Sequence, residues 1–299
     1  MVAASRAKAS DRAALLKKLF PVVKKNYKVQ VPKGGKAVLE TMLYAVCLED
    51  STVDEADASF KKLFTDFPDL NEVRVSTVGE IERAFLGQTA SEWRAYRVIS
   101  VLKFVFDKNY AFEFESLRKK TLDLATKQLA KIKDLTPFVR DYTLHDVTGA
   151  HLIPIDTSLS RLLVWLGLVP PGLPVDQVGE TMKAAVRKAE VESFVFTLRN
   201  LATDATMNTA FDPVKYAVPE GGHDLDTAID RLNLLLKVGP EKAGKASAAK
   251  PVVDKKPTPK KAAPAANTKA AEKPRKKDSV SATAAKKSAP AKKPVKKGH

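Results

Sequence analysis

One aspartate lies where a carboxylate could either cap a helix or take part in chemistry. Asp156 follows an apolar stretch at residues 152–155 and precedes a strongly apolar helical run at residues 157–168. An aspartate at this place is a favourable N-cap, because its side-chain oxygen accepts a backbone N–H of the first turn. A carboxylate can also stabilise positive charge that develops on a bound substrate. The sequence leaves both roles open, and one residue can fill both.

A second segment of interest lies upstream of Asp156, where helical periodicity stops and resumes. Residues 117–132 have the spacing of a helix, and a new helix is expected to start at Thr136-Pro137, because proline fits a first turn. The residues at this restart are Thr136, Pro137, Phe138, Val139 and Arg140. Three further side chains near Asp156 could contact a ligand or belong to the core, namely Tyr142, His145 and His151.

The elements that must position these residues are predicted to be helices throughout. Apolar residues recur at i, i+3 and i+4 along most of the body, and no convincing strand alternation is present. The fold class is therefore all-α. Helices are expected at residues 10–23 (kinked or split at Pro21), 37–48, 53–64, 77–85, 91–106, 117–132, 135–147, 157–168, 175–188, 191–201 and 225–238.

The last sixty residues differ in composition from the rest. Residues 240–299 hold no Phe, Trp or Tyr, and their 17 Lys and 1 Arg against 4 acidic residues give a net charge of +14, of the chain's total of +16. We expect this tail to be disordered and to bind nucleic acid without reading sequence, through counterion release. Its lysine pairs are Lys255 and Lys256, Lys260 and Lys261, Lys276 and Lys277, Lys286 and Lys287, Lys292 and Lys293, Lys296 and Lys297.

Composition also suggests a domain division and limits the cofactors. We expect an N-terminal helix or extension at residues 1–30, a helical domain at 31–239 and the tail at 240–299. Cys47 is the single cysteine and the four histidines lack ligand spacing, so neither a metal site nor an iron–sulfur cluster is expected. No signal peptide or membrane span is recognised, so a cytoplasmic, nucleoid-associated location is expected, nuclear in a eukaryote, without a membrane partner. The protein is expected to be a monomer.

The order of these motifs carries a resemblance. A helix, a turn and a second helix at residues 117–143, an apolar stretch, and Asp156-Thr157 opening an apolar helix with Arg161 follow one another. Together with residues 36–47 and 58–64, this order resembles the helix-hairpin-helix (HhH-GPD) DNA glycosylase superfamily, in its endonuclease III-like group, in a divergent form. The resemblance covers about residues 30–210 and implies a two-lobed helical body.

The resemblance implies a function in base excision repair. A member of this superfamily bends duplex DNA and flips a nucleotide into a pocket between two helical subdomains. The hairpin at residues 136–140 would bind phosphate, and Asp156 would support cleavage of the N-glycosidic bond. Tyr142, His145 and His151 would be possible pocket residues. The implied partner is duplex DNA, possibly damaged.

Three positions depart from the superfamily pattern. The lysine that forms a Schiff base in bifunctional members falls at Asp141, which is not an amine, so lyase activity of that kind is not expected. The two hairpin glycines fall at Pro137, which has no N–H, and at Val139, which disfavours positive φ. If the protein is an enzyme, it is therefore expected to be a monofunctional DNA N-glycosylase.

Two other interpretations remain open. The same fold could be a catalytically inactive nucleoid- or chromatin-associated DNA-binding protein, whose tail is similar to those of linker histones. An unrelated all-α interaction domain with a polycationic tail is the third interpretation. An acidic cluster at residues 49–57 is expected to be a solvated face. Whether Asp156 lines an open pocket or is sealed as a buried cap separates the first two interpretations.

Overall fold

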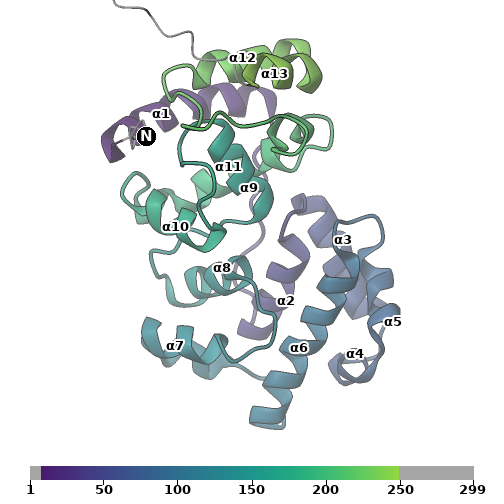
Figure 1. Cartoon of the computed structure of the whole chain (residues 1–299). Coiled ribbons are helices and arrows are strands. Elements are labelled where there is room, and N and C mark those ends of the chain that lie inside the picture. Colours follow the sequence, from purple (N-terminus) through teal and green to yellow (C-terminus); the bar gives the residue numbers. More distant parts are fainter. Residues whose placement is uncertain (1–7, 249–299) are drawn as a thin grey trace, which may run out of the picture. The chain divides into compact units, whose positions relative to one another are not determined.

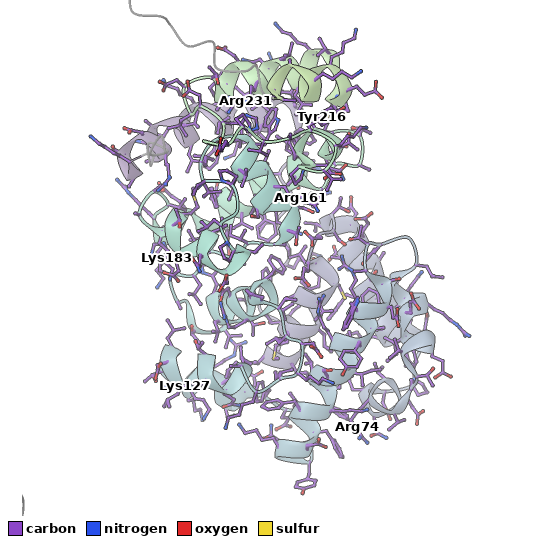
Figure 2. All side chains as sticks on the ribbon, viewed as in Figure 1. Arg74, Lys127, Arg161, Lys183, Tyr216 and Arg231 are labelled. Carbon is purple, nitrogen blue, oxygen red and sulfur yellow. The ribbon has the colours of Figure 1, made fainter. Side chains whose placement is uncertain are left out.

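The computed structural model describes residues 8–248, and the regular secondary structure of this part is helical (Figure 1; side chains in Figure 2). No β-strand occurs among the described residues, so the predicted all-α class is confirmed. The same residues contain no helix with the length and apolar character needed to cross a membrane. The helices are α1 (Ala9–Asn26), α2 (Val38–Leu48), α3 (Val53–Thr65), α4 (Leu70–Val75), α5 (Val78–Glu82), α6 (Ser91–Asn109), α7 (Leu122–Leu129), α8 (Pro137–Thr148), α9 (Thr157–Trp165), α10 (Val175–Lys183), α11 (Val191–Ala202), α12 (Ala228–Val238) and α13 (Pro240–Ser247), with 3₁₀ turns η1 (Arg83–Phe85), η2 (Glu115–Lys119), η3 (Lys188–Glu190) and η4 (Asn208–Phe211).

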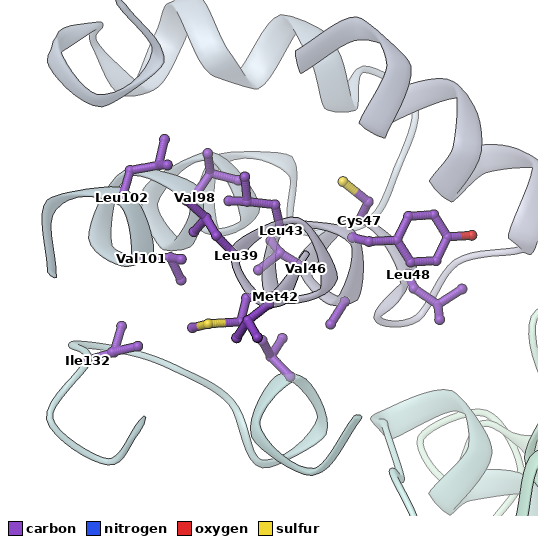
Figure 3. Close-up of a cluster of buried hydrophobic side chains, with 14 of the residues drawn as sticks. Leu39, Met42, Leu43, Val46, Cys47, Leu48, Val98, Val101, Leu102 and Ile132 are labelled. Atoms are coloured by element: carbon purple, nitrogen blue, oxygen red, sulfur yellow. The ribbon is translucent and has the colours of Figure 1, made fainter. Parts of the chain in front are cut away.

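The first of two hydrophobic cores is built around α2. Ten of the eleven residues of α2 are buried, because the helix packs against α3, α6 and α8 on different sides. A helix that is apolar all round is stable only when surrounded in this way. Figure 3 shows the centre of this core, where side chains of α2 meet those of α6: Leu39, Met42, Leu43 and Val46 with Val98, Val101 and Leu102.

The second core joins the two ends of the described chain. Helix α1 packs against α11 and α12, and α9 packs against α10 and α11. Leu19 of α1, Leu162 of α9 and Phe194 of α11 are fully buried in this core. Helix α1, which lies in the segment predicted as an N-terminal helix or extension, thus contributes to the second core. Pro21 lies inside α1 without ending it.

Helical packing continues beyond the point at which the composition changes. Helix α13 starts at Pro240, and its Gly244 lies so close to the Tyr216 ring that a Cβ there would collide with it. The Trp165 indole N–H donates to Ser247 Oγ at 3.3 Å. The first eight residues of the predicted tail therefore belong to the helical body. Residues 249–299, with all six lysine pairs, lie outside the described residues.

Two local predictions were wrong. The helix expected at residues 117–132 is divided, because Thr121 caps a new helix through the N–H of Leu124. The apolar spacing that predicted a helix at residues 91–106 includes Trp93 among its inward positions, but Trp93 is 56% exposed and its neighbour Arg94 is buried instead. Arg94 is buried because it donates hydrogen bonds to carbonyl groups at the end of α2.

The segment that leads to Asp156 lies very close to the backbone of α10. A substitution in α10 can test this close approach. A Cβ on Gly179 of α10 would lie 2.7 Å from the carbonyl oxygen of Ile153. We expect Gly179→Ala to lower the free energy of unfolding by about 1–3 kcal/mol, because α10 must move away from this segment. Urea denaturation measures the change.

Gly79 in α5 provides the matched control. Nothing lies within 4 Å of a Cβ added at Gly79. Gly79→Ala should therefore stabilise the protein by about 0.5–1 kcal/mol, as expected for a helical glycine. Equal effects of the two substitutions would contradict the close approach at Gly179.

Candidate functional site

Asp156 is the N-cap of α9 and is completely buried. Its Oδ1 accepts the N–H of Leu159 at 2.9 Å, and its Oδ2 accepts the N–H of Asp50 at 2.9 Å. The exposed fraction of its side chain is 0%. The carboxylate therefore links the start of α9 to the corner between α2 and α3.

A buried arginine completes the environment of this carboxylate. Arg199 of α11 donates through Nη1 to Asp156 Oδ2 and through Nη2 to the carbonyls of Leu48 and Ser51. The exposed fraction of the arginine side chain is 2%. The two groups form a buried ion pair in which both carboxylate oxygens accept hydrogen bonds. Such a pair is costly to break, because either partner alone would leave a buried charge.

A second buried arginine, Arg94, faces the interior at the start of α6, where Trp93 is exposed. Arg94 donates to the carbonyls of Val46 and Cys47 at 2.9 and 3.1 Å, to that of Thr89 at 2.8 Å, and to that of Glu49. The last carbonyls of a helix have no partners within it and carry partial negative charge. Arg94 and Arg199 together satisfy these carbonyls at the end of α2.

Two acidic residues border Asp156. Asp50 has a left-handed backbone (φ 50°), and its Oδ1 accepts the N–H of Ser158 at 2.6 Å, so Asp50 and Asp156 cap α9 together. Burial, and then the charge of Asp156, raise the pKa of Asp50. Burial also raises the pKa of Glu49, although its ion pair with Arg97 at 2.9 Å acts against this. The expectation that both residues lie on a solvated face was wrong.

A cavity of about 310 Å³ lies beside these carboxyl groups. Its walls come from the corner after α2, the start of α6, the start of α8 and the start of α9. The cavity thus brings together the predicted hairpin and Asp156, which are distant in sequence. Its lining residues include Glu49, Asp50, Ala90, Arg97, Thr136 and Asp156.

The predicted hairpin forms the first turn of α8. Thr136 is the N-cap and accepts the N–H of Val139 at 3.3 Å, while Pro137 in the first turn has no N–H. Both features reduce the number of N–H groups that this turn offers a phosphate. Phe138 and Val139 are buried in the first core, and Arg140 forms an ion pair with Asp141 at 2.7 Å. Burial raises the pKa of Asp141, which is not among the residues lining the cavity.

The three other predicted pocket residues do not gather at Asp156. Tyr142 and His145 line a second cavity of about 190 Å³, bordered by Asp146 and Glu192. The Nδ1 atom of His145 is 2.9 Å from the Ala150 carbonyl. His151 lines neither cavity, and its Nε2 atom is 2.9 Å from the carbonyl of Val186.

Among the described residues, no three His, Cys, Asp or Glu side chains are arranged to hold a metal ion. The thiol of Cys47 is fully buried in the first core, and this burial raises its pKa to about 12.

Comparison with solved structures identifies the architecture. The structure of a non-covalent endonuclease III–DNA complex matches with a TM-score of 0.50 and 14% identity, over 70% of this chain and 96% of that chain. The helical body has an endonuclease III-like fold. A trapped endonuclease III–DNA covalent intermediate, in an estranged-adenine complex, matches with a TM-score of 0.47 and 13% identity, over 62% of this chain and 84% of that chain. No family model and no curated protein matches the sequence.

The predicted resemblance is therefore confirmed at the level of the fold. Within this endonuclease III-like fold, Asp156 is the cap that its sequence position predicted, whereas the roles of Arg199 and Arg94 were not predicted. The sequence contained only a weak indication that these arginines are buried. The helical periodicity places each of them on the same face as apolar residues. A charged residue on such a face indicates a buried partner, but the sequence does not say which one.

Proposed function

We propose that this protein binds duplex DNA as a monomer and that its endonuclease III-like body does not cleave the N-glycosidic bond. The observation that carries the second part is the state of Asp156. Its carboxylate is fully buried and paired with Arg199, and its two oxygens accept hydrogen bonds from three residues. The proposal corresponds to a nucleoid- or chromatin-associated role.

Two features support DNA as the partner. The similar solved structures are endonuclease III–DNA complexes, although at 14% identity the likeness concerns the fold. Residues 249–299 contain 15 Lys and 1 Arg against 3 acidic residues, a net charge of +13. A lysine-rich polycation gains affinity for DNA from counterion release, which carries no sequence information. Affinity would therefore come mainly from the tail, because residues 1–239 carry a net charge of only +2.

The environment of Asp156 opposes catalysis on electrostatic and steric grounds. A carboxylate that stabilises a developing oxocarbenium ion must approach the sugar with its charge available. Here the guanidinium of Arg199 already neutralises that charge, and the carboxylate has no exposed surface. Asp141, at the position of the catalytic lysine of bifunctional relatives, cannot form a Schiff base. The proposed role needs no iron–sulfur centre, and Cys47 alone could not hold one.

Base excision assays test the proposal. In single-turnover reactions, duplexes bearing uracil, alkylated, oxidised or mismatched bases should be bound but not cleaved, and borohydride should trap no covalent adduct. Denaturing gels measure base release after alkaline cleavage of abasic sites, and gels of the borohydride-treated samples measure the adduct. An active glycosylase in parallel reactions shows that each substrate is competent. Base release from any duplex would contradict the proposed lack of glycosylase activity, and a trapped adduct would reveal an amine nucleophile.

A second candidate is a monofunctional DNA N-glycosylase. It is favoured by the cavity of about 310 Å³ at the start of α9, which could accommodate a nucleobase. In this case Asp156 would have to exchange its partner Arg199 for the substrate. Excision without a trapped adduct in the same assays would establish this candidate.

A further inference from the structure

An aromatic pair, of which Trp93 is exposed and Tyr96 partly buried, lies on α6 next to the cavity. Trp93 is 56% exposed, and its ring contacts that of Tyr96 edge to face, with centroids 5.9 Å apart. The ammonium of Lys133 lies 5.4 Å from the centre of the Tyr96 ring. We call Trp93, Tyr96, Arg97 and Lys133 the aromatic–basic patch.

The patch is continuous with the cavity. Arg97 is one helical turn from Trp93, lines the cavity, and donates to the carbonyl of Asp134 at 3.3 Å. This bond ties α6 to the turn that carries Lys133 and precedes Thr136. Ala90, the left-handed residue that precedes α6, also lines the cavity. An extended ligand could therefore contact the patch and reach the cavity mouth.

The composition of the patch favours one kind of ligand. A single exposed tryptophan is common and needs no explanation. Here two aromatic rings lie beside an exposed cation, Lys133, which combines a stacking surface with a site for phosphate. Aromatic rings with neighbouring cations are the usual means of holding unpaired nucleotides. Glu92 is exposed next to Trp93, so phosphate is expected on the side of Lys133.

We propose that the aromatic–basic patch binds an unpaired nucleotide, with the base stacked on Trp93 and the adjacent phosphate at Lys133. This inference rests on the proposed DNA-binding function and adds a preference for unpaired over fully paired nucleotides. It does not require cleavage of the DNA.

The two tryptophans of the chain make the proposal measurable. Trp165 is 3% exposed in the second core, so Trp165→Phe leaves Trp93 as the only tryptophan. In the full chain carrying this substitution, oligothymidine and a duplex with a one-base bulge should quench the emission of Trp93, with the midpoint found by anisotropy. The fully paired duplex should bind with much weaker quenching. Trp93→Phe, which retains Trp165, should show no quenching with any of these ligands.

Affinity provides an independent measurement. Trp93→Ala should weaken binding of the bulged duplex about 5- to 150-fold, the range expected for one lost base stack. Tyr110→Ala is the matched control, because Tyr110 is an 83% exposed aromatic residue just beyond the far end of α6. Melting temperatures should be unchanged in both variants, since both side chains are exposed.

The outcomes separate this inference from the proposed function. Suppose that anisotropy shows binding, but Trp93 is not quenched and Trp93→Ala loses no affinity. This result would overturn the proposed nucleotide site at the aromatic–basic patch while leaving DNA binding intact. Equal quenching by paired and bulged duplexes would overturn the preference for unpaired bases. Absence of binding to every oligonucleotide would refute the proposed function itself.

Discussion

Asp156→Asn is expected to lower the free energy of unfolding by about 3–5 kcal/mol, the cost of breaking a buried ion pair. Asparagine can keep one oxygen for the N–H of Leu159. Its amide nitrogen would then replace Oδ2, which accepts hydrogen bonds from Arg199 and from the N–H of Asp50. Donors would face donors, and the guanidinium charge would be buried without a counter-charge. Urea denaturation with an unchanged m-value measures the loss.

Asp50→Asn is the matched control for this prediction. Its Oδ1 can still accept the N–H of Ser158, whereas the repulsion between two neighbouring carboxylates is removed. Because the folded-state pKa of Asp50 is raised, ionisation of this carboxyl costs stability as pH rises above its ordinary value of 3.8. Asp50→Asn should therefore stabilise the protein at neutral pH and have no such effect below that value. Equal destabilisation by the two substitutions would contradict the ion-pair account.

The same contacts change how a substitution at Asp156 must be interpreted. In an enzyme with this fold, loss of product after Asp→Asn would indicate a catalytic carboxylate. Here the substitution removes the bonds that connect α9, α11 and the end of α2. A loss of DNA binding or of any activity would follow from unfolding as readily as from chemistry. Stability must therefore be measured beside every functional assay of this variant.

The helices were predictable because their signals are local. Apolar residues at i, i+3 and i+4 report contacts within one face, and the two cores use most of the residues that this spacing identified. The N-cap roles of Asp156 and Thr136 were also predictable, since a cap bonds the turn that follows it.

The charged interior was not predictable from such local signals. Arg199 and Asp156 are 43 residues apart, and their pairing depends on how α9 and α11 meet. In α6, neighbouring residues point about 100° apart, so periodicity alone did not exclude Trp93 from the core. Arg94 is buried instead because the end of α2 supplies carbonyl acceptors, which exist only once the helices have packed.

Removing residues 249–299 is expected to weaken duplex binding at least about tenfold near 100 mM salt and to flatten its salt dependence. The deletion removes 16 cations and 3 acidic residues. Each phosphate that a cation neutralises contributes about −0.9 to the slope of log K against log salt, so the slope should fall by several units. Fluorescence anisotropy at a series of salt concentrations measures this change. An unchanged slope would show that the helical body, rather than the tail, supplies the phosphate contacts.

A longer deletion, from residue 240, separates DNA binding from folding. It also removes α13, with the buried Ala243, the contact between Gly244 and Tyr216, and the hydrogen bond from Trp165 to Ser247. We expect the same loss of DNA affinity as in the shorter deletion, together with a loss of about 1–3 kcal/mol in stability, from exposed apolar surface and one lost hydrogen bond. The shorter deletion should leave the melting temperature unchanged. Equal melting temperatures for both truncations would mean that α13 does not stabilise the second core, and the body would then end at residue 239, where the composition changes.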